Sequence, residues 1–116
     1  MKFMTLVKTT KAGAGAPPVA LMQAIGELGM AAGQAGVLVQ QGGLMGKDSS
    51  AFVAVRGGEV MVTDGPFAES KELVGGYAVY DVPSKAEAVD WATRFARLHT
   101  LHWPEWEGEI EVRQIM

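Results

Sequence analysis

The sequence predicts one α+β domain over residues 1–116, and three observations support that prediction. At 116 residues, with 48% apolar residues, the chain has the size and apolar content of a domain with its own core. Runs of β-prone residues alternate with helical apolar stripes, in the order strand, helix, strand, hairpin, strand, helix, strand. The hairpin is marked by Gly57-Gly58 between two short β-prone runs, because tight turns of this kind need positive φ angles.

The first strand is predicted over residues 2–8, where apolar side chains fall on both faces, as in a central strand. A helix follows, with Pro17 and Pro18 in its first turn, where a missing N–H costs nothing. Its apolar residues recur at spacings of three and four between Leu21 and Ala32. Gly36 is the expected C-cap.

The middle of the chain is rich in short strands. One is predicted over residues 37–41, two more over 52–56 and 59–63 flank the glycine pair, and another covers 76–82. The hairpin therefore interrupts the chain between the second strand and the strand that begins at Gly76.

A second helix is predicted after Ser84, because Ser84 and Glu87 form a capping box. Its apolar stripe begins at Ala88, and the helix is expected to end near Leu98. A final strand over residues 109–115 shows the alternation of a half-buried strand.

Without the hairpin, this order is the βαββαβ plan of a ferredoxin-like domain. Both helices then cover one face of the sheet and leave the other open. Since apolar residues also occur on that second face, we expect it to pair with a second copy in a C2 homodimer.

Composition excludes several classes of protein. The chain has no cysteine, which rules out disulfides, thiolate nucleophiles and Cys-ligated zinc and fits a cytoplasmic location. No stretch has the pattern of a signal peptide or the length of a membrane span. The net charge is −3 and the basic residues are scattered, so we expect no nucleic-acid partner and no membrane partner.

The most specific motif is Asp64-Gly65-Pro66-Phe67-Ala68-Glu69-Ser70-Lys71-Glu72, followed by Gly75-Gly76-Tyr77. It resembles the signature of the DGPF-type proteins of the YCII-related family, and both ends of the chain are also similar to that family. The resemblance implies a ferredoxin-like protomer in a dimeric α+β barrel. It also implies kinship with small enzymes that act on compact cyclic or carbonyl substrates without a metal, alongside members with no assigned activity. We expect no cofactor.

Asp64 is the first candidate catalytic residue. An Asp-Gly-Pro turn at the end of a hairpin could aim the carboxylate into a cleft as a general base, or the carboxylate could simply cap the turn. Phe67 is a candidate cleft wall or a core residue. Glu69 and Lys71 are candidates for binding a ligand, and their alternative is a solvated charged face.

His99 is the second candidate catalytic residue, because an imidazole with a pKa near 6.5 suits acid–base chemistry. The alternative is a histidine that stabilises the C-terminal end of the helix. His102 and Glu105 lie close in sequence, but their spacing gives only weak support to a metal site, and none is predicted.

Three further residues are candidates for ligand binding: Tyr77, Trp103 and Arg113. Trp103 could instead anchor a dimer contact, as paired tryptophans on a non-helical segment often do. A buried Arg113 would need an acidic partner.

Two functions remain open at this point. One is a metal-free enzyme that performs proton transfer, isomerisation or lyase-type chemistry on an unknown small molecule near Asp64. The other is a non-catalytic ligand-binding or regulatory domain that uses the same cleft.

Overall fold

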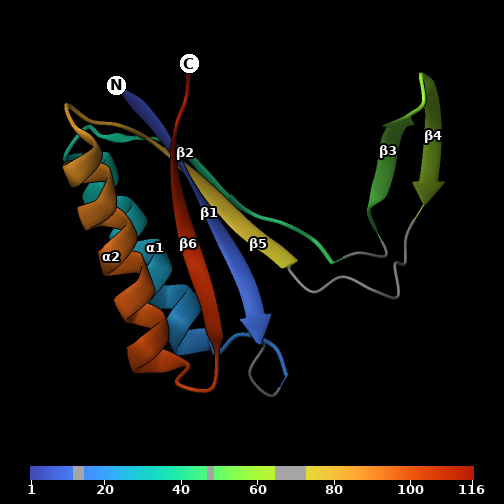
Figure 1. Cartoon of the computed structure of the whole chain (residues 1–116). Coiled ribbons are helices and arrows are strands. Elements are labelled where there is room, and N and C mark those ends of the chain that lie inside the picture. The colour runs from blue at the N-terminus through green and yellow to red at the C-terminus, as the bar shows by residue number, and fades with distance from the viewer. Residues whose placement is uncertain (12–14, 47–48, 65–72) are drawn as a thin grey trace.

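The computed structural model describes residues 1–11, 15–46, 49–64 and 73–116 (Figure 1). These residues form a four-stranded sheet, two helices and a separate two-stranded hairpin. In chain order the elements are β1 (Lys2–Lys11), α1 (Val19–Gln34), β2 (Leu38–Gly43), β3 (Ala51–Arg56), β4 (Glu59–Asp64), β5 (Leu73–Asp81), α2 (Lys85–His102) and β6 (Glu107–Gln114).

The four-stranded sheet has the order β2-β5-β1-β6, and every neighbouring pair is antiparallel. The first strand is therefore central, with Thr5 opposite Ala78 of β5 and Val112 of β6. The hairpin β3–β4 lies between β2 and β5 in the chain but forms its own sheet. This arrangement confirms the ferredoxin-like α+β fold with an inserted hairpin.

The core lies between one face of the sheet and the two helices. Strand alternation puts Phe3 of β1 and Tyr80 of β5 on this face, and both are almost completely buried. Tyr80 stacks on Trp91 of α2, with 6.0 Å between the ring centroids. Ala32 and Ala88, which have no exposed surface, let the two helices approach the sheet closely.

Helix α1 ends in a Schellman motif. Ala35 is the C-cap, and Gly36 follows it with a φ of 75°, a conformation that glycine adopts without strain. The Gly36 N–H donates to the carbonyl of Gly33, and the Val37 N–H donates to that of Ala32. The predicted end of this helix is therefore correct to within one residue.

Helix α2 begins as predicted but ends later. The Ser84 hydroxyl accepts from the Glu87 N–H at 3.2 Å, as in a capping box. The expected end near Leu98 is wrong, because the helix continues to His102. It ends there because Pro104 disfavours a helical conformation at Trp103. Neither helix of the described residues is long and apolar enough to cross a bilayer.

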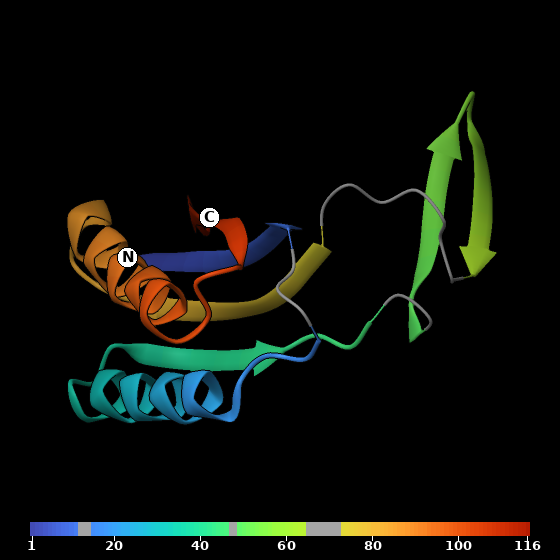
Figure 2. The same ribbon diagram turned by 90° about the horizontal axis from the view of Figure 1, so that it is seen from below.

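The hairpin β3–β4 projects away from the four-stranded sheet (Figures 1 and 2). Its turn has φ angles of 56° at Gly57 and 81° at Gly58, which confirms the predicted tight turn. The projection enlarges the molecule: the radius of gyration is 15.8 Å. A compact domain of this length is expected to have about 13.4 Å.

Candidate functional site

A cavity of about 350 Å³ lies between the helices and the sheet, at the end of the sheet where β1 ends and β6 begins. This volume lies within the usual range for sites that bind small molecules. Its described lining is mainly apolar, with Val7, Pro17, Leu21, Met22, Ile25, Leu44, Ala78, Phe95, Trp103 and Trp106. The polar residues of the lining are Thr5, Thr9, Gln41, Tyr77 and His99, and glycines of β2 and β5 complete it.

His99 is the buried histidine of this cavity. It lies on the face of α2 that also buries Ala88 and Ala92, and only 6% of its surface is exposed. Its Nδ1 is 3.1 Å from the backbone carbonyl of Phe95, one turn earlier in the helix. The Phe95 ring lies 5.0 Å from the imidazole, centroid to centroid, so both the orientation and the position of the ring are restrained.

The second ring nitrogen of His99 is available to a ligand. A carbonyl oxygen can only accept, so the contact with Phe95 requires a hydrogen on Nδ1 and leaves a lone pair on Nε2 of the neutral ring. No described residue bonds to Nε2, yet this atom is not sealed inside the protein. His99 is one of the residues that line the cavity, so the unbonded Nε2 is a candidate hydrogen-bond acceptor for a bound molecule.

Burial also sets the charge of His99. Desolvation lowers its pKa below the ordinary value of 6.5, and the hydrogen bond to Phe95 offsets only part of this effect. The ring is therefore neutral at pH 7. A neutral imidazole with a free Nε2 can accept a hydrogen bond or a proton from a bound molecule.

Trp106 connects His99 to the end of β1. Its indole ring lies 4.4 Å from the imidazole, centroid to centroid, and its Nε1–H donates to the Thr9 hydroxyl at 3.0 Å. The Thr9 oxygen thus acts as an acceptor toward Trp106, and its own hydrogen remains available to a ligand.

Gly108 makes room for this tryptophan. A Cβ at that position would lie 2.5 Å from the Trp106 ring and would overlap the backbone carbonyl oxygen of Lys8. The absence of a side chain at the start of β6 therefore lets Trp106 form the wall of the cavity.

Gln41 of β2 lines the cavity, and its side chain lies against α1. A Cβ at Gly29 would overlap the amide nitrogen of Gln41, so this helix glycine accommodates a side chain. Gly26 and Gly33 face open space.

The motif around Asp64 lies largely outside the described residues. Asp64 is the last residue of β4, and its backbone pairs with Ala51. Its side chain lies outside the described part of the chain, as do Phe67, Glu69 and Lys71. Their suggested roles as base, wall and ligand contacts stay predictions.

Trp103 lines the cavity, whereas Tyr77 contributes to its edge but pairs with Leu6, so strand alternation puts the Tyr77 side chain on the face of the sheet that the helices leave open. Trp103 is only 8% exposed, so its own protomer already covers it and it is no exposed anchor for a dimer. The Tyr77 ring covers Gly42, and its hydroxyl accepts a hydrogen bond from Gln40 Nε2 at 2.9 Å.

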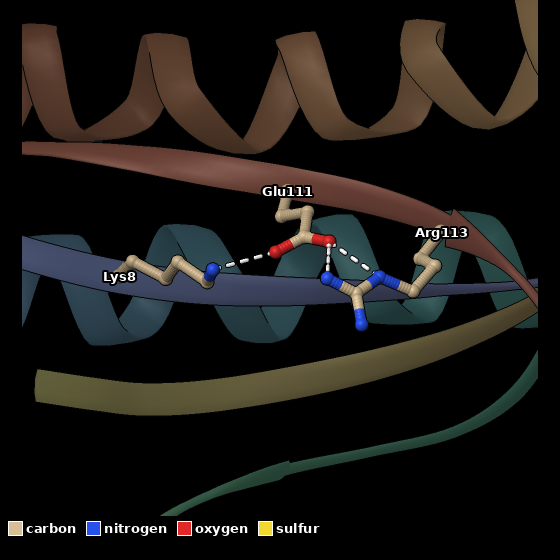
Figure 3. Close-up of polar contacts among 3 residues, drawn as sticks. All are labelled: Lys8, Glu111 and Arg113. Carbon is tan, nitrogen blue, oxygen red and sulfur yellow. Dashed lines mark hydrogen bonds and ion pairs between the residues drawn. The ribbon is translucent and has the colours of Figure 1, made fainter.

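Arg113 lies on the opposite face of the sheet, because strand alternation places it with Glu111 and away from the helices (Figure 3). Arg113 does not line the described cavity, and its role in ligand binding stays a prediction. It pairs instead with Glu111, which also accepts from Lys8 at 2.6 Å. Hydrogen bonds from Lys8 and Arg113 lower the pKa of Glu111.

Most of the described cavity lining was absent from the predicted site, including Thr9, Phe95 and Gln41. Thr9 has the same parity on β1 as Phe3 and Thr5, and Phe95 precedes His99 by one helical turn. These spacings could have indicated both residues. No sequence signal indicates Gln41. Among the described residues, no group of three His, Asp or Glu side chains could hold a metal ion.

The comparisons with known proteins give the family. The sequence model of the YCII-related domain matches residues 1–116. The chain belongs to the YCII-related family. No curated protein matches this YCII-related chain. It is also similar to a solved structure, the 5-chloro-2-hydroxyhydroquinone dehydrochlorinase (TftG) from Burkholderia phenoliruptrix AC1100 in complex with 2,5-dihydroxybenzoquinone. The identity is 13% and the TM-score 0.47, over 100% of this chain and 94% of the other.

Proposed function

We propose that the chain is a small-molecule-handling domain whose working site is the His99 cavity. The observation that supports this most strongly is the free Nε2 of a buried, neutral histidine in a largely apolar cavity of about 350 Å³. A histidine buried only for packing would be expected to bond through both nitrogens or to turn the unused one toward solvent.

The lining indicates the chemical class of the ligand. No charged side chain belongs to the described lining, so a charged ligand would lose its hydration without gaining a counter-charge. The ligand is therefore compact, mainly apolar and uncharged. It carries a hydroxyl or N–H group that donates to His99 Nε2, and it offers an acceptor to the Thr9 hydroxyl.

The catalytic form of this proposal assigns proton transfer to His99. The neutral Nε2 takes a proton from the bound molecule, and the resulting imidazolium returns it at another atom. That sequence corresponds to isomerase or lyase-type chemistry. Asp64 retains its suggested role as a second base or orienting group.

A second candidate is a domain that binds the same kind of molecule without chemistry. It is favoured by the absence of a carboxylate or an amine from the described lining, because proton transfer usually needs a second positioned group. In this case His99 only accepts a hydrogen bond.

We also propose that the domain acts as a homodimer with the helix-free face of the sheet at the interface. Met4 and Leu6 of β1 are half-buried on this face, which neither helix covers. Light scattering at micromolar concentration tests this proposal through the molar mass.

The ligand proposal is tested by a thermal-shift screen of compact neutral rings that bear a hydroxyl or amide, each matched with a carboxylate of the same size. Benzyl alcohol and benzoate are one such pair. We expect neutral members to stabilise the wild type and not His99→Phe, which keeps the ring volume but removes Nε2. Equal shifts for both proteins, or a preference for the carboxylates, would refute the proposed site.

A further inference from the structure

The hairpin β3–β4 has one face made of valines. Val53 pairs with Val62 and Val55 with Val60, and strand alternation puts all four on the same side of the ribbon. Each of them is between 66% and 72% exposed. These four valines, the valine face of the hairpin, are among the most exposed large apolar side chains of the described residues.

Such a ribbon is not stable by itself. A single two-stranded hairpin is at best marginally stable in water, and it gains stability when its apolar face packs against another surface. This hairpin projects from its own sheet and lengthens the molecule to 45 Å (Figures 1 and 2). The protomer thus leaves the valine face exposed to solvent.

The area of the valine face fits a dimer. The usual gain on burying a valine corresponds to roughly 60–120 Å² of apolar surface for each side chain. Two hairpins contribute eight valines, and together with the matching surface on the receiving side they bury roughly 1,000–2,000 Å². A standard stable interface buries about 1,200–2,000 Å² in total.

The same chain also offers a surface that can receive the hairpin. The helix-free face of the sheet carries Met4 and Leu6 beside the ion pairs of Glu111 with Lys8 and Arg113, and neither helix nor hairpin of the same protomer lies over it (Figures 1 and 2). In a two-fold arrangement, each hairpin covers the partner while its own sheet face is covered in return. A second copy of the chain therefore covers both the valine face of the hairpin and the helix-free face of the sheet.

We propose that the β3–β4 hairpin is an arm that packs its valine face on the helix-free sheet face of a second copy of this chain. The inference rests on the proposed homodimer and goes beyond it, because it assigns the hairpin a place in the interface. Each sheet is then covered by its own two helices on one face and by the partner's arm on the other.

The test uses the absence of native cysteines. A single cysteine, introduced as Val55→Cys, is labelled with a benzophenone maleimide and irradiated, and the same is done with Val19→Cys. Val19 is a matched control because it is also 72% exposed but lies at the start of α1. We expect a covalent dimer of twice 12.3 kDa from the arm label only, with the crosslink in the peptide that contains Met4 and Leu6.

A second variant measures the contribution of the valines. Val53→Thr with Val62→Thr keeps the shape and the strand propensity but removes two methyl groups from each arm. We expect it to raise the dimer dissociation constant at least about 100-fold, whereas Val19→Thr leaves it unchanged. If the wild type is a dimer but the label on the arm does not crosslink, the arm does not lie in the interface, although the proposed homodimer is still supported. A wild-type monomer would overturn both, and the ligand proposal would be unaffected.

Discussion

Gly108→Ala is expected to lower the free energy of unfolding by about 3 kcal/mol or more. The new Cβ would overlap the carbonyl oxygen of Lys8 in the neighbouring strand and lie 2.5 Å from the Trp106 ring. A backbone carbonyl in a paired strand cannot move far, so the overlap is relieved mainly by displacing Trp106 or opening the β1–β6 pairing. Chemical denaturation followed by tryptophan fluorescence measures the loss.

The control for this change is Gly26→Ala in α1. An added Cβ meets no heavy atom within 4 Å there, and alanine favours a helix over glycine by about 1 kcal/mol. We therefore expect a small gain in stability. If Gly108→Ala unfolded at the same denaturant concentration as the wild type, Gly108 would not lie in close contact with Trp106.

For any compound that the protein converts, His99→Phe is expected to reduce turnover by about 10²–10⁴-fold. The phenyl ring fills the same space beside Trp106 but has no nitrogen to take the proton. The measurement is kcat with saturating compound, after denaturation has shown that the variant is folded.

His99→Gln separates binding from catalysis. Its amide oxygen can still accept a hydrogen bond, but the amide does not titrate. If His99 is the base, we expect His99→Gln to bind the compound within a few-fold of the wild type and to turn it over as poorly as His99→Phe. Equal turnover in all three proteins would assign the chemistry elsewhere, with Asp64 the next residue to replace.

Local patterns predicted most of the fold. The capping box at Ser84 and the turn at Gly57-Gly58 involve residues close in sequence, so their geometry follows from short-range chemistry. The end of α2 was harder, since it depends on Pro104, beyond the last clear apolar residue of the stripe.

The site was less predictable, because its geometry depends on contacts between distant parts of the chain. Trp106 bonds to Thr9, 97 residues away, and only the register of β1 against β6 brings them together. The surroundings of Arg113 could not be predicted for the same reason. Its position on the strand was predicted, but alternation alone did not tell which face the helices cover.

The motif at Asp64 only resembles a family signature, whereas the described cavity is built from residues that belong to no motif. His99 was selected for its chemistry. What makes it a candidate in the structure is the longer helix, which carries it over the sheet and anchors its Nδ1 on Phe95.

The protonation state of His99 also affects the free energy of unfolding. Because its pKa is lowered in the folded protein, the unfolded chain binds the proton more readily. The free energy of unfolding therefore falls as the pH drops below about 6.5, until the folded pKa is passed.

The most direct test of the central claim is a pH titration of the His99 ring by ¹H–¹⁵N NMR, with His102→Gln to assign the signals. A neutral ring with its hydrogen on Nδ1, and a pKa below the ordinary 6.5, is the result that a free Nε2 in the cavity requires. A hydrogen on Nε2, or a pKa above 6.5, would contradict it.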